Sequence, residues 1–159
     1  MDSTTITAYF EQDHDRLDAL LTTFHEVKRK DFALAKERFR EFKFGLQRHI
    51  VWEEDLLFPL WEQHSGITEG PTAVMRTEHK RIGAALETLH DKVKQGDPEC
   101  DPEEQALIAL LEAHNLKEER VLYPAIDHAI TEEERQSLFL RMQQIPEERY
   151  HVCCGVHEG

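Results

Sequence analysis

The sequence predicts an all-α protein: an up-down-up-down antiparallel four-helix bundle with a short C-terminal helix and a tail. Three observations support this. Apolar residues recur at helical spacing through most of the chain, and glycine and proline gather in a few short segments. In addition, the pattern of the first half recurs 65 positions later. We expect residues 1–130 to form the bundle, and residues 131–159 to form the C-terminal helix and a flexible tail.

The first hairpin follows from helix signals on either side of one turn. The first helix is expected from about Thr4 to Lys28, because its apolar residues fall on one face. Asp31 is a plausible N-cap for the second helix, which should run to about Glu62. Glycines and a proline within residues 65–71 then predict the loop that joins the two hairpins.

The second hairpin repeats this order. Its first helix should carry the apolar residues around His79, and the proline-containing segment 96–102 should form the turn. Pro102 suits the first turn of the next helix, which should continue to about Ala125. A last short helix should start at Thr131 and stop at Pro146, before a polar tail.

The repeat preserves polar chemistry as well as apolar positions. In each half, a histidine is followed 35 positions later by a second histidine and then, four positions on, by a glutamate. The two sets are His14, His49 and Glu53, and His79, His114 and Glu118. The midpoint of each histidine pair falls in a predicted turn, so an antiparallel hairpin places both histidines at one height. All six side chains should therefore lie in one layer of the bundle.

Such a layer is best explained by metal. Two ionised carboxylates in a small core cost several kcal/mol each unless they are paired or bound to a cation. No inward stripe offers Lys or Arg, so His⁺–Glu⁻ pairs are the alternative. Four imidazoles and two carboxylates suit iron, manganese or zinc. One six-coordinate metal could use all six groups, but two metals bridged by both glutamates also explain the duplication and leave each metal a position for a small molecule.

These residues resemble the hemerythrin-like family, also called HHE cation-binding domains, whose motif is His followed later by His-x-x-x-Glu. The aromatic–proline pairs Phe58-Pro59 and Tyr123-Pro124, one after each copy, are also similar. The resemblance covers roughly residues 8–128. It implies a non-heme di-iron centre with an oxo or hydroxo bridge. The histidines of the first set would bind one iron, those of the second set the other, and the two glutamates would bridge them.

One departure from the family narrows the expected function. Oxygen-carrying hemerythrins have a fifth histidine on the third helix, but the positions four residues from His79 are Met75 and Gly83. The set of four histidines and two glutamates more resembles di-iron proteins linked to nitrosative stress and iron–sulfur cluster repair. We therefore expect binding or sensing of O₂, NO or peroxide at an open metal position. The alternatives are a di-iron redox enzyme or iron donor in the stress response, and an iron store or sensor.

Composition disfavours other classes of partner. The chain has 32 acidic and 19 basic residues, a formal net charge of −13, which argues against nucleic acid and anionic membranes. No apolar run is long enough to span a membrane. Three cysteines do not make a disulfide framework, and no signal peptide is evident, so we expect a cytoplasmic protein.

Further histidines and cysteines lie outside the six-residue set. His25 and His90 are also related by the 65-residue shift, and we expect them to be paired polar residues near the turns. The tail carries four soft or borderline ligands, His151, Cys153, Cys154 and His157. They could bind metal or exchange thiols, but exposed thiols in a mobile end are the favoured interpretation.

Overall fold

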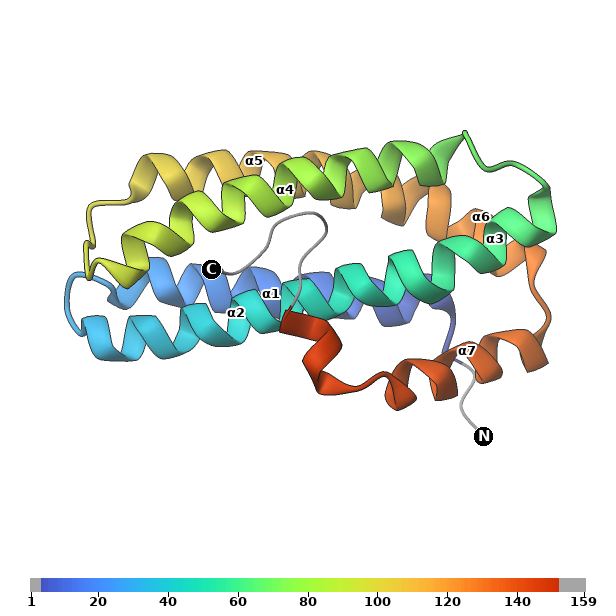
Figure 1. The fold of residues 1–159 in the computed structure, drawn as a ribbon, viewed down its shortest axis with the longest axis horizontal. Coiled ribbons are helices and arrows are strands. Elements are labelled where there is room, and N and C mark those ends of the chain that lie inside the picture. The colour runs from blue at the N-terminus through green and yellow to red at the C-terminus, as the bar shows by residue number, and fades with distance from the viewer. Residues whose placement is uncertain (1–3, 152–159) are drawn as a thin grey trace.

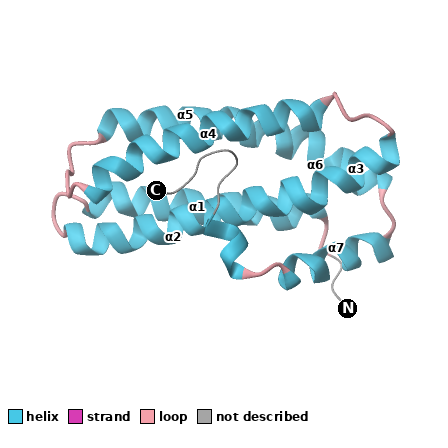
Figure 2. Ribbon diagram, viewed as in Figure 1, coloured by secondary structure: helices cyan, strands magenta, loops and turns pink. Residues whose placement is uncertain are grey.

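The computed structural model describes residues 4–151, and its regular structure in that range is helical (Figure 2). Four long helices form two hairpins that lie side by side (Figure 1). The first hairpin is α1 (Ile6–Val27) and α2 (Phe32–Trp52), and the second is α4 (Pro71–Lys94) and α5 (Asp101–Lys117). The predicted all-α class and helical bundle are therefore confirmed. No helix in the described part is long and apolar enough to cross a membrane.

Short helices extend α2 and α5. A π-helical turn at Glu53–Leu57 links α2 to α3 (Phe58–Ser65), and a second at Glu118–Leu122 links α5 to α6 (Tyr123–Ala129). The sequence predicted each of these stretches as one uninterrupted helix. The repeat is thus visible in the structure, down to the position of the irregular turn.

Helix ends follow the expected local chemistry. The side chain of Asp31 accepts the backbone N–H of Leu34 at 3.1 Å and so caps α2, as predicted. Gly66 ends α3 with φ of 75°, a left-handed conformation that glycine adopts without steric cost. Pro71 and Pro102 lie in the first turns of α4 and α5, where no backbone N–H is required.

The core consists of two apolar clusters with a polar layer between them. On α1, Phe10 belongs to one cluster and Leu17 to the other, and the buried His14 lies between them. The cluster containing Leu17 fills the end of the bundle near the two hairpin turns. The polar layer is therefore enclosed by hydrocarbon on both sides, which lowers the local dielectric and strengthens its electrostatic contacts.

The C-terminal segment packs against the cluster that contains Phe10. Helix α7 (Glu132–Gln144) buries Leu138 and Met142 there, and a 3₁₀ turn at Glu147–His151 buries Tyr150. The Tyr150 hydroxyl accepts the indole N–H of Trp52 at 3.0 Å. Pro146 follows the last α-helix, as predicted, and the 3₁₀ turn comes directly after it. Cys153, Cys154 and His157 lie outside the described residues.

Candidate metal centre

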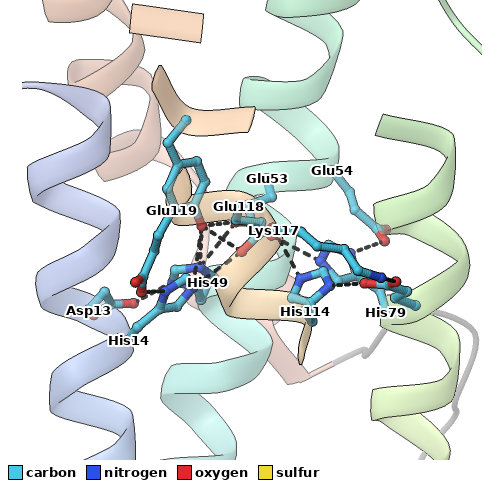
Figure 3. A network of polar contacts seen from close by, with 12 residues as sticks. Asp13, His14, His49, Glu53, Glu54, His79, His114, Lys117, Glu118 and Glu119 are labelled. Carbon is cyan, nitrogen blue, oxygen red and sulfur yellow. Dashed lines mark hydrogen bonds and ion pairs between the residues drawn. The ribbon is translucent and has the colours of Figure 1, made fainter. Parts of the chain in front are cut away.

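The six side chains predicted to bind metal meet in one buried layer (Figure 3). None is more than 4% exposed. Their nitrogen and oxygen atoms fall into two groups of four, within each of which all atoms lie within 4.8 Å of one another. His14 and His49 belong to one group and His79 and His114 to the other, while Glu53 and Glu118 belong to both.

Each glutamate spans the two histidine pairs. Glu53 places one carboxylate oxygen 3.2 Å from Nε2 of His49 and the other 2.9 Å from Nε2 of His79. Glu118 contacts the remaining histidines in the same way, at 3.2 Å from Nε2 of His14 and 3.1 Å from Nε2 of His114. All four Nε2 atoms therefore face the two central carboxylates.

The outer nitrogen of every histidine contacts a further carboxylate at 2.7 or 2.8 Å. These Nδ1 pairs are His14–Glu119, His49–Asp13, His79–Glu54 and His114–Glu78. A carboxylate that accepts the Nδ1 proton leaves Nε2 as the metal-facing nitrogen and fixes the ring. The repeat did not identify these four acids as part of the site, although each is adjacent in sequence to one of the six predicted ligands.

The acid pairs also join the two halves of the repeat. Asp13 and Glu78 are related by the 65-residue shift, and each supports a histidine of its own hairpin. Glu54 and Glu119 are related in the same way, but each supports a histidine of the other hairpin. Glu54 and Glu119 thus connect the two hairpins at the centre, as Glu53 and Glu118 also do.

The buried histidines are strongly basic in this setting. Burial opposes the charged form of His49, but the nearby Glu53 and Asp13 outweigh it and raise the pKa to about 10. Burial likewise opposes protonation of His79, yet its bonds to Glu53 and Glu54 raise the pKa to about 9. His⁺–Glu⁻ pairing, the alternative considered from sequence, is therefore favoured at His49 and His79 before metal binds. A metal ion has to displace these protons.

The two π-helical turns set the positions of the aromatic rings at the centre. In an α-helix, the ring of Pro59 would clash with the carbonyl four residues earlier, and the wider turn avoids this. The backbone N–H of Phe58 instead bonds to the carbonyl of Glu53, and that of Tyr123 to the carbonyl of Glu118. The wider turn brings each aromatic residue to the helix face of the glutamate five positions before it.

The aromatic residues make the two halves chemically unequal. The ring of Phe58 stacks on His79, with centroids 5.7 Å apart, and the ring of Tyr123 stacks on His14 at 5.8 Å. Only Tyr123 carries a hydroxyl, which contacts Glu53 and lies 2.8 Å from Oε1 of Glu118. Burial, and then the two carboxylates, raise the pKa of Tyr123, so its hydroxyl keeps its proton. The sequence pattern did not identify Tyr123 as part of the site, although the difference between Phe58 and Tyr123 is visible in the repeat.

A small cavity adjoins the polar layer on the side away from Tyr123. Its volume is about 10 Å³, close to the space that one water molecule requires. It is lined by all four histidines and Glu53, and by apolar side chains such as Leu46, Ile50 and Ile82. The layer therefore offers a small, mainly apolar space beside its nitrogen atoms.

A second polar cluster lies near the hairpin turns. Nδ1 of His25 is 2.8 Å from Oε1 of Glu104, while Nζ of the buried Lys28 contacts Glu104 and lies 2.5 Å from Asp101. Lys28, which the inward stripes read from sequence did not include, is buried here because its long stem reaches the core from the C-cap position of α1. Both histidines are paired, as predicted: His25 with Glu104, and His90 with Glu87, where Nδ1 lies 3.3 Å from Oε1.

Comparison with known proteins agrees with this geometry. No match is found among curated proteins or among solved structures. Residues 5–126 match the family described as the hemerythrin HHE cation binding domain. That range covers most of the chain and contains all six central side chains and their four outer carboxylates. The chain therefore belongs to the hemerythrin HHE cation-binding family.

Proposed function

We propose that this protein is a non-heme di-iron protein, an up-down-up-down four-helix bundle that binds or senses a small ligand such as O₂, NO or peroxide. The observation that carries the proposal is the sharing of Glu53 and Glu118 between two histidine pairs. Two carboxylates placed between two imidazole pairs suit two bridged metal ions better than one. Iron, rather than manganese or zinc, is proposed because the family typically binds iron.

The donor set fits the metal that the family implies. Each proposed iron would have two imidazole nitrogens and one oxygen from each glutamate, and would keep coordination positions for an oxo or hydroxo bridge and a small ligand. The metal pair supplies ligand binding and electron transfer when bound. The chain's own residues orient the imidazoles through Nδ1, exclude bulk water, and hold a protonated hydroxyl at Tyr123.

Reconstitution with Fe(II) under argon, followed by exposure to O₂ or NO, tests the function. We expect an optical change on ligand addition that reverses when the gas is removed. Catalytic turnover would favour the alternative of a redox enzyme, and steady release of iron would favour an iron donor or store. An unchanged spectrum with every ligand would contradict the proposed binding function.

Tyr123 gives the enzyme alternative some support, because its hydroxyl is a buried proton donor beside the two bridging carboxylates. The Tyr123→Phe substitution makes that position match Phe58. If the protein only binds its ligand, we expect the substitution to change ligand affinity by less than tenfold, and neither wild type nor variant should show turnover. If it reduces peroxide or NO, the rate should fall at least tenfold, which stopped-flow turnover measurements would detect.

A further inference from the structure

A cavity between α1 and α5 comes close to the metal layer. It has a volume of about 310 Å³ and lies over an apolar floor that includes Leu21, Ile108 and Leu111. The two helices of each hairpin pack closely along their length, whereas α1 and α5 belong to different hairpins and leave this space between them. We refer to it as the α1–α5 cavity.

The α1–α5 cavity meets the small cavity at the metal layer. Both are lined by Asp18 and Leu111, and the small cavity is also lined by Asn115. Asp18 is exposed and Asn115 is half-buried, so both side chains can change rotamer at the surface. The α1–α5 cavity and the small space beside the four histidines therefore share part of their walls.

Other large cavities do not lead to this point. One of about 690 Å³ lies between α1, α2 and the C-terminal segment and contains Arg16 and Arg48. It reaches Asp13, but none of the six central side chains lines it. Another, of about 370 Å³ beside His151, also contains none of the six.

The α1–α5 cavity is strongly acidic. Four carboxylates line it, those of Asp18, Glu26, Glu104 and Glu112, and His25 is its single basic or titratable nitrogen group. Lys28 offsets the charge of Glu104, which leaves three carboxylates uncompensated at the cavity wall. Partial burial raises the pKa of Asp18, and the nearby carboxylates Asp15, Glu112 and Glu119 raise it further, while His14 acts in the opposite direction.

We propose that the α1–α5 cavity is the entrance to the metal centre and that its carboxylates admit cations and neutral molecules in preference to anions. This inference rests on the proposed function, since it assumes a metal centre that exchanges ligands. A concave wall of one charge changes the association rate of charged molecules by roughly ten- to a thousandfold at low salt. Neutral NO, O₂ and H₂O₂ feel no such field, while azide is repelled and Fe(II) is attracted.

The preference of the entrance for cations and neutral molecules over anions is tested with the iron-loaded double variant Asp18→Asn/Glu112→Gln. Its azide association rate should rise roughly three- to tenfold at low ionic strength, and its NO association rate should be unchanged. The rate of Fe(II) uptake by the apoprotein should fall by a similar factor. High salt should remove all of these differences. A matched control is Glu37→Gln/Glu69→Gln, which removes two exposed carboxylates elsewhere and should behave as wild type.

The route itself is tested by narrowing the junction. Asn115→Phe, and separately Leu111→Phe, should slow NO association severalfold while the protein still holds its full iron content. Unchanged NO rates in both variants would overturn the entrance, and equal azide rates in the charge variant and its control would overturn the selectivity. If wild type takes up no iron at all, the proposed function has failed, and the route is then contradicted together with it.

Discussion

At the scale of single residues, the centre depends on four histidines, each of which contacts a carboxylate through its outer ring nitrogen, Nδ1. His49 illustrates the arrangement: Nδ1 contacts Asp13 at 2.8 Å, and Nε2 faces Glu53. Although burial opposes ionisation of Asp13, its bond to His49 lowers the pKa to about 2, so the acid stays charged. Orientation of the ring by such a partner is part of metal affinity.

We therefore expect Asp13→Asn to weaken metal binding by roughly 10- to 100-fold without unfolding the protein. The cause is a less basic and less firmly oriented His49. Competition with a chromophoric chelator measures the affinity, and the exposed Glu11→Gln on the same helix is the control. An affinity within twofold of wild type would show that the outer carboxylates do not support the ligands.

The same pairs predict a pH dependence. The pKa values of about 10 for His49 and about 9 for His79 lie above the unfolded value of 6.5, so both rings are protonated at pH 7 before metal binds. Metal should then release about two protons per chain, and its apparent affinity should rise from pH 6.5 to pH 9. Calorimetry in buffers of different ionisation enthalpy counts the protons, and zero release would contradict the assignment.

The same pKa shifts predict the opposite pH trend for the stability of the apoprotein, which should fall as the pH rises. Because the folded pKa values are raised, the contribution of these two histidines to the apoprotein is complete below pH 6.5. It is lost as the pH rises through 9 and 10. Urea unfolding of the chelator-treated protein should therefore show a falling free energy of unfolding between pH 8 and pH 10.

At the scale of secondary-structure elements, the two π-helical turns are the least regular part of the bundle. Each begins at a central glutamate and ends before an aromatic–proline pair. The sequence could predict the helices, because apolar spacing and capping residues such as Asp31 act locally. It could not predict the wider turns, because a proline within a helical pattern is compatible with a kink, a break or an inserted residue.

Replacing Pro124 by Ala tests the role of the turn. Alanine restores the backbone N–H and removes the clash, so the α-helical form can compete and move Tyr123 away from the layer. We expect metal affinity to fall at least fivefold while helix content, measured by circular dichroism, stays constant. Exposed Pro146, which follows α7, offers a control position, and Pro146→Ala should leave affinity unchanged. Equal affinities in the two variants would contradict a role for the turn.

At the scale of the whole molecule, the repeat accounts for what could be read from sequence alone. The hairpin midpoints place six side chains at one height, and the structure brings all six together. Contacts between hairpins could not be read in this way, because they depend on how the hairpins face each other. The pairing of His14 with Glu119 and that of Lys28 with Glu104 are two such contacts.

The shared glutamates also couple the two halves of the molecule. Loss of one histidine pair should weaken the binding of one metal ion, whereas loss of a shared carboxylate should weaken the binding of both.

Metal should further stabilise the folded chain, because it binds a layer that exists only in the folded bundle, and the melting temperature should rise with metal concentration.

The central claim is that one layer holds two metal ions through shared glutamates, and the iron content of reconstituted protein tests it most directly. We expect two iron ions per chain in wild type, fewer in His49→Ala and in His114→Ala, and almost none in Glu53→Ala. Circular dichroism should show that each variant is folded. One iron per chain in wild type, or an iron content in Glu53→Ala equal to that of wild type, would contradict the account.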